Sequence, residues 1–235
     1  MIWFGRHISL WNHWYNCTVN YPRANVGVSG RQRLYAKARQ IINKLLKRNN
    51  EERMQLRERS VEIPLAIDFL NTWIKDEPVI ELGCVLPYYI LIAPNHKVYD
   101  LVDDHPANTK KDLRDFNVND YKNNIISIST IEHISHGDYG IAKTDVTAVD
   151  ILNKISNNAK RYFVTFPLGC NHELDEYVLA NLEDCVFVTR KNDNKNDWQV
   201  VLDKHDLTAQ QKVYGSYCAA NTVCIVSNCL KASPS

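Results

Sequence analysis

A glutamate and a histidine stand side by side directly after an apolar segment of the chain. Glu132 and His133 follow the run Ile-Ile-Ser-Ile-Ser at 125–129. An imidazole accepts protons near neutral pH, so His133 at the mouth of a site could take the proton of a substrate hydroxyl. The alternative is a structural histidine that hydrogen-bonds a backbone carbonyl, and the sequence leaves both roles open.

A metal site is the weaker interpretation of the same region. The side chains that would supply its ligands are His133, His136 and Asp138, with His105 or His172. Scattered His and Asp residues are more typical of hydrogen-bonded loops, so we expect no metal.

The seven cysteines predict reduced thiols. Their number is odd, they are scattered, and none forms a C-x-x-C pair, which argues against a disulfide framework and a zinc ribbon. Residues 1–15 lack the apolar core of a signal peptide, and no run approaches the roughly 18 apolar residues of a membrane span. We therefore expect a cytoplasmic protein without a membrane span.

Short apolar runs that alternate with helical or loop stretches must position these residues. The runs are 79–82, 98–102, 125–129, 162–166, 186–189 and 222–227. Their alternation predicts an α/β domain with a mostly parallel sheet, right-handed crossovers and helices on both faces. In such sheets the ligand lies at the carboxyl ends of the strands, near the switch in strand order, where Glu132 and His133 are expected.

Two helices are predicted ahead of the sheet. Apolar residues at 34, 38, 41 and 45 predict the first, from about 30 to the low 50s. The second begins at Ser60, has Pro64 in its first turn and ends at the turn 75–78; its expected buried side is Leu65, Phe69, Leu70, Trp73 and Ile74. We expect residues 1–58 to form an aromatic arm and a basic helix, and 59–235 to form the main domain.

The formal net charge of +1 excludes a global attraction to polyanions. Between 31 and 60, however, ten basic residues stand against three acidic ones. A solvated helix face with an apolar stripe packed on the domain or on a second copy is the simpler interpretation. Binding of this segment to RNA or to an anionic membrane surface is the alternative.

The turn after the first predicted strand has an acid, any residue and then a glycine, at Glu81-Leu82-Gly83. This resembles the first motif of the class I S-adenosylmethionine-dependent methyltransferases, in which a glycine lets the backbone approach the cofactor. Val85 and Pro87 replace the later glycines of that motif. The resemblance implies cofactor contacts at Glu81, Gly83 and Cys84.

An acid after the second strand is the family's partner for the ribose hydroxyls, because a carboxylate can accept from both. Asp100 and Asp103 lie 19 and 22 residues after Glu81, so spacing does not choose between them. The resemblance also implies cofactor contacts at Asp115 and Ser129.

The most specific match is the stretch that ends in Glu132-His133, which resembles the family's D-x-I-x-S-x-S-x-x-E-H pattern. Similar segments follow at 137–140 and 165–171, and the likeness runs from about 59 to 228. It implies catalytic roles for Glu132 and His133, and contacts to the acceptor substrate from four further residues: Thr130, Asp138, Tyr139 and Asn171.

The resemblance implies a seven-stranded, Rossmann-like class I methyltransferase sheet with an N-terminal helical extension. It implies methyl transfer from S-adenosylmethionine to an oxygen of a carbohydrate or small metabolite, since no D/N-P-P-Y stretch follows the fourth strand. Two other functions stay open: a catalytically silent binding or assembly protein, motivated by Val85 and Pro87, and an RNA-binding or RNA-modifying protein that uses the basic helix. The N-terminal region would also serve a homo-oligomer.

Overall fold

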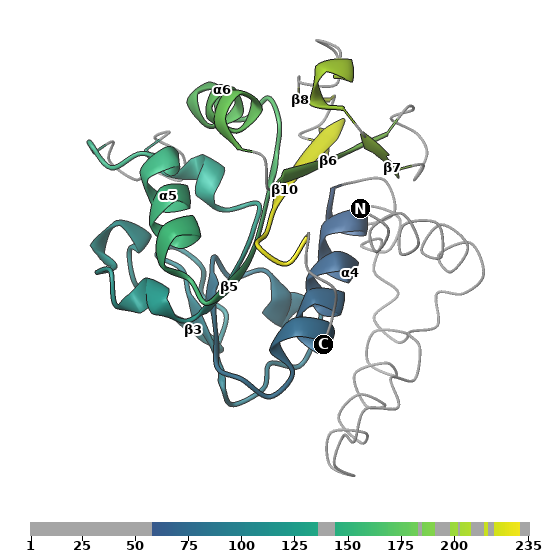
Figure 1. Ribbon diagram of the computed structural model, residues 1–235. Helices are drawn as coiled ribbons and strands as arrows, with labels where there is room; N and C mark the ends of the chain where they lie inside the picture. The colour runs from purple at the N-terminus through teal and green to yellow at the C-terminus, as the bar shows by residue number, and fades with distance from the viewer. Residues whose placement is uncertain are drawn as a thin grey trace, which may run out of the picture.

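The computed structural model describes residues 58–135, 144–182, 185–190, 198–201, 203–207, 214–215 and 219–230 (Figure 1). The expected aromatic arm and basic helix lie outside these residues, as do Asp138 and Tyr139. The described domain begins where the second predicted helix begins.

Eight strands form one sheet in the order β3-β2-β1-β4-β5-β10-β6-β7. The strands are β1 (Val79–Leu82), β2 (His96–Tyr99), β3 (Asn108–Thr109), β4 (Asn124–Ile128), β5 (Arg161–Pro167), β6 (Cys185–Arg190), β7 (Trp198–Val201) and β10 (Thr222–Val226). The first five are parallel, whereas β10 is antiparallel to both β5 and β6, and β7 is antiparallel to β6. A separate two-stranded ladder joins β8 (Tyr214–Gly215) to β9 (Ala219–Ala220).

The sheet therefore has eight strands where the resemblance implied seven, and the last three strands in the order, β10, β6 and β7, pair antiparallel with their neighbours. A strand is present at each of the six predicted apolar runs. Three of them, β2, β4 and β10, end earlier than predicted, and the first two ends have a local cause. β2 ends at Tyr99 because the Asp100 carboxylate accepts the backbone N–H groups of Val102 and Asp103, which turns the chain. β4 ends at Ile128 because Ser129 has a left-handed backbone, φ +40°.

Helices cover both faces of the sheet (Figure 1). The helix α4 (Arg59–Phe69) packs on one face, and α5 (Ala148–Asn158) and α6 (His172–Asn181) pack on the other. β5 shows how the strand sequence serves two cores: Tyr162, Val164 and Phe166 join the α5/α6 core, and Phe163 joins the α4 core. Burial on both faces explains why the central strands are almost continuously apolar.

The helix predicted from Ser60 is confirmed, with one correction. Pro64 lies inside α4 and not in its first turn, because the helix already begins at Arg59. Proline has no N–H to donate to the carbonyl four residues earlier, so only one hydrogen bond near the start of the helix is lost. After Phe69 the chain makes a π-helical turn, Leu70–Ile74, which ends at Lys75 with φ +53°.

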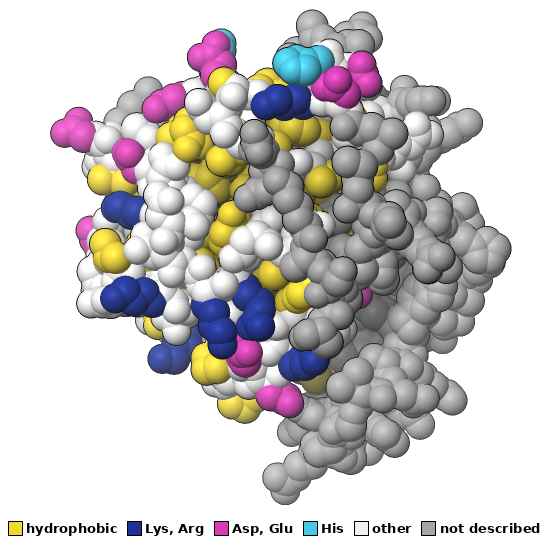
Figure 2. Space-filling view, in the orientation of Figure 1, with side chains coloured by type: hydrophobic (Ala, Val, Ile, Leu, Met, Phe, Trp, Pro, Cys, Tyr) yellow, Lys and Arg dark blue, Asp and Glu magenta, His cyan; other side chains and the backbone are white. Residues whose placement is uncertain are grey.

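The face of the described domain drawn in Figure 2 carries side chains of both charges. Figure 2 shows basic and acidic side chains on the same face, with hydrophobic and uncharged side chains between them. Within the described ranges, no helix is long and apolar enough to cross a bilayer.

Candidate functional site

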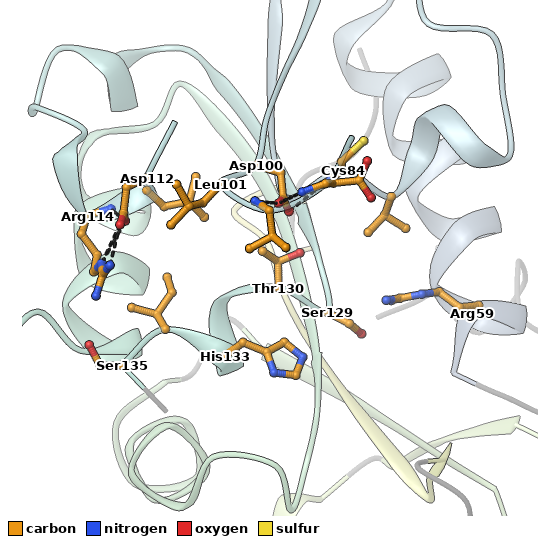
Figure 3. A pocket seen from close by; sticks show the side chains of 15 residues that line it. Arg59, Cys84, Asp100, Leu101, Asp112, Arg114, Ser129, Thr130, His133 and Ser135 are labelled. Carbon is orange, nitrogen blue, oxygen red and sulfur yellow. Dashed lines mark hydrogen bonds and ion pairs between the residues drawn. The ribbon is translucent and has the colours of Figure 1, made fainter. Parts of the chain in front are cut away.

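A pocket of about 270 Å³ opens at the carboxyl ends of β1, β2 and β4 (Figure 3). The sheet order reverses there, since β2 and β3 lie on one side of β1 and β4 lies on the other. Ligands of doubly wound sheets bind in the crevice at this switch point. The lining residues from the loops after the strands include Cys84, Val85, Asp100, Asp103, Ser129, Thr130 and His133.

Glu81 holds the turn after β1 from beneath. Its side chain is buried, and Oε1 accepts the backbone N–H groups of Val85 at 2.9 Å and Leu86 at 2.7 Å. His96 Nε2 lies 2.9 Å from Oε2 and donates to it. Glu81 does not line the pocket. Glu81, predicted as a cofactor contact, therefore fixes the position of the turn, and the turn lines the pocket.

Gly83 has no room for a side chain. Its φ of +91° lies in the left-handed region, and its N–H donates to the Tyr99 carbonyl at 2.8 Å. A Cβ at this position would lie 2.0 Å from Thr130 Oγ1. The turn after β1 and the loop after β4 therefore approach each other so closely that only glycine fits.

Cys84, the next residue, lines the pocket. Burial, together with the neighbouring Asp103 carboxylate, raises the pKa of its thiol. A thiol with a raised pKa stays neutral, so this small side chain forms an uncharged part of the pocket wall.

Two aspartates follow β2, and both line the pocket. Asp100 accepts from Val102 N at 2.8 Å and Asp103 N at 2.9 Å through Oδ1, and from Cys84 N at 3.3 Å through Oδ2. Asp103 accepts from the Tyr88 hydroxyl at 2.9 Å and from His105 N at 2.7 Å. Asp100 is thus the acid tied to the glycine turn. The Asp103 hydrogen bond raises the pKa of Tyr88 to about 12.

The loop after β4 brings Ser129, Thr130 and His133 into the pocket. Glu132 points away from solvent and is fully buried, and His133 Nε2 lies 3.7 Å from its Oε1. That separation is longer than a hydrogen bond. Neither oxygen of Glu132 has a hydrogen-bond partner among the described residues. Burial raises the pKa of this carboxyl well above its ordinary value, and the negative charge of Glu62 adds to the effect.

Of the predicted site residues that the structure describes, five do not line the pocket: Glu81, Gly83, Asp115, Glu132 and Asn171. Asp115 is exposed, whereas Asp112 lines the pocket in its place and makes an ion pair with Arg114. Asn171 caps α6 by accepting from Leu174 N at 3.1 Å, and its Nδ2 donates to the Glu132 carbonyl at 2.9 Å. Asn171 therefore ties α6 to the loop of Glu132.

Sequence reasoning also missed the pocket residue Arg59. It stands in the segment 59–64 ahead of the sheet, and nothing in its spacing marks it as part of the site. The helix α4 brings it there through tertiary packing alone. No set of three or more His, Cys, Asp or Glu side chains that could hold a metal ion occurs in the described part of the chain.

Comparisons with known proteins add no family to this geometry. No family model matches the chain, and no curated protein or solved structure matches it.

The close approach at Gly83 generates a first prediction. Gly83→Ala combines a strained backbone with a clash against Thr130, so we expect it to lower the free energy of unfolding by more than about 2 kcal/mol in urea denaturation. Gly169→Ala is the matched control because Gly169 has φ +90°, so it tests backbone strain by itself. An equal loss in the two variants would contradict a close contact specific to Gly83.

The buried Glu132 generates a prediction about pH. Its folded-state pKa is raised from 4.5, so the stability this group contributes is present below pH 4.5 and is lost as the pH rises. Glu132→Gln keeps the shape of the protonated acid and does not titrate. We expect the Tm of Glu132→Gln, measured against the wild type, to be higher at pH 7.5 than at pH 4.5.

Glu77 is the matched control, because its pKa is shifted in the opposite direction. Hydrogen bonds from Lys160, Asn124 and Arg161 lower the pKa of Glu77 to about 2, so its contribution is present above pH 4.5 and is lost as the pH falls toward 2. Glu77→Gln should therefore lower Tm at pH 7.5, and less so toward pH 2. A Glu132→Gln difference that does not change with pH would show that Glu132 titrates normally.

Proposed function

We propose that the pocket binds S-adenosylmethionine and that the protein transfers its methyl group to an oxygen of a carbohydrate or small metabolite. The proposal rests on one observation: Cys84, Asp100 and His133 line the same pocket at the switch in strand order. These residues come from three separate motif regions of the resemblance, and all three meet in this crevice.

The sheet is compatible with the same proposal. Its parallel part has the doubly wound order 3-2-1-4-5, with the pocket at the reversal of strand order. The antiparallel β10 is inserted between β5 and β6, away from that reversal. The resemblance implies a mostly parallel sheet, and the strands that surround the pocket are all parallel.

The residues around the pocket fit a nucleoside. Cys84 and Val85 of the turn after β1 line the pocket, so a ligand in it would lie against this turn. Asp100 accepts from three backbone N–H groups, and because an ionised carboxylate has about four acceptor sites, one remains for a ribose hydroxyl. Apolar side chains of Leu101, Leu113 and Ile134 offer a surface for a base.

Methyl transfer mainly requires that the protein align the acceptor oxygen with the methyl carbon. The bound cofactor would supply a methyl group on a positively charged sulfur, which leaves as a neutral thioether when the acceptor oxygen forms its bond to that carbon. His133 would receive the proton of the acceptor hydroxyl, and the pocket walls would hold oxygen and methyl in line. The acids at Asp100, Asp103 and Asp112 suit a positively charged ligand.

A second candidate is a protein that binds the cofactor without turnover. The observation that favours it is the turn after Gly83, where the Val85 side chain lines the pocket and Pro87 is buried, in place of the later glycines of the motif. These side chains narrow the approach of a ligand to the backbone. The two candidates predict the same binding and differ only in the fate of the methyl group.

Cofactor binding is tested by calorimetry with S-adenosylmethionine and S-adenosylhomocysteine. We expect both to bind the wild type, and Asp100→Asn to weaken binding by about tenfold or more, because an amide presents one acceptor oxygen in place of two. Asp104→Asn is the matched control, since the Asp104 side chain is 88% exposed and lies outside the pocket. Absence of binding at millimolar concentration would overturn the proposal.

Turnover is tested by release of S-adenosylhomocysteine in the presence of a panel of monosaccharides and hydroxy acids. We expect His133→Gln to lower the rate by about 100-fold, the usual effect of losing a general base. His172→Gln is the control, because His172 lies on α6 with 84% of its side chain exposed. Binding without release in the wild type would favour the second candidate.

A further inference from the structure

We propose that Arg59 forms a carboxylate-binding subsite on the α4 side of the pocket. The inference rests on the proposed function and goes further, because it states which chemical group of the ligand lies at this wall. Figure 3 shows the Arg59 side chain extending from α4 toward Ser129 and the interior of the pocket.

Most N–H donors of the Arg59 guanidinium make no hydrogen bond to the described residues. A guanidinium carries five N–H donors. Among the described residues, its one hydrogen bond runs from Nη1 to Glu62 Oε2, at 2.6 Å. Its side chain is only 23% exposed, so the remaining donors have limited access to water. A planar carboxylate matches the fork geometry of such donors better than any other common group.

Glu62, itself held by hydrogen bonds, fixes the position of the Arg59 guanidinium. Glu62 is fully buried, and its Oε1 accepts hydrogen bonds from Ser129 Oγ and Thr165 Oγ1, each at 2.7 Å. These contacts tie α4 to the ends of β4 and β5. The subsite is thus positioned before any ligand arrives, which lowers the entropic cost of binding.

The surrounding acids do not exclude an anion. Glu58 and Glu132 face the same region, but burial raises the pKa of both carboxyls and favours their neutral forms. The Glu62 charge is shared with two hydroxyl donors. The pocket aspartates follow β2 and β3, so a ligand with both a hydroxyl-bearing part and a carboxylate would lie with its carboxylate at Arg59.

Two sources could supply this carboxylate: the amino-acid part of S-adenosylhomocysteine, or an acidic acceptor such as a sugar acid. Three calorimetric comparisons distinguish them. S-adenosylhomocysteine is compared with 5′-methylthioadenosine, which keeps the nucleoside and sulfur but lacks the amino acid. Glucuronate is compared with glucose, each titrated into protein that already holds 5′-methylthioadenosine. Every titration is repeated on a variant and on its control.

The variant is Arg59→Gln, and the matched control is Arg161→Gln. Arg161 also makes an ion pair, to Glu77 at 3.1 Å, but it begins β5 at the opposite end of the strands from the pocket. We expect Arg59→Gln to weaken one carboxylate-bearing probe by about tenfold or more, and to leave 5′-methylthioadenosine and glucose unchanged. If Arg59→Gln weakens the binding of S-adenosylhomocysteine, Arg59 binds the carboxylate of the cofactor. If it weakens the binding of glucuronate, Arg59 binds the carboxylate of the acceptor. Arg161→Gln should bind every probe as the wild type does.

Folding is controlled by thermal melts and by Arg59→Lys, which keeps the charge beside Glu62. We expect this variant to fold and to bind the affected probe with intermediate affinity, because an ammonium lacks the planar fork. Unchanged affinity for both carboxylate probes in either folded variant would overturn the subsite. If the wild type binds no nucleoside, the proposed function fails, and titration of glucuronate alone decides the subsite: Arg59-dependent binding supports it, and any other result overturns it.

Discussion

One buried carboxylate organises the turn on which the site depends. Glu81 lies in the sheet with no exposure to solvent, and it accepts two backbone N–H groups of the turn and one imidazole N–H from β2. A buried charge is tolerated only where hydrogen bonds replace the lost water, so the turn has little freedom to move. The close approach of Gly83 to Thr130 and the hydrogen bond from Cys84 to Asp100 both follow from this fixed backbone.

A second buried carboxylate, Glu62, fixes the wall of the pocket on the α4 side, as Glu81 fixes the turn after β1. It joins α4 to Ser129 on one strand end and to Thr165 on the next, and it orients Arg59. Glu132 has no such partners among the described residues, and burial favours its neutral form. The walls of the pocket are therefore set by buried glutamates that differ in how they are hydrogen-bonded.

The sheet was predictable because its central strands are buried on both faces and read as apolar runs. β3 and β7 were harder, since β3 is two residues long and β7 has only one fully buried side chain. Within the site, Cys84, Asp100 and His133 were found because each lies in the loop that follows a strand. Arg59 was missed because its place depends on a contact between Glu62 and Ser129, which are 67 residues apart. Glu81 was taken as a ligand contact, and its burial beneath the turn could be learned only from the fold.

We propose that a nucleoside cofactor occupies the crevice between the glycine turn and the end of β2. A crystal structure of the protein with S-adenosylhomocysteine tests it most directly. We expect electron density for the adenosine between Gly83 and Asp100, with a ribose hydroxyl within hydrogen-bond distance of the Asp100 carboxylate. Density for the ligand at another place, or a crevice that holds only water at saturating ligand, would contradict it.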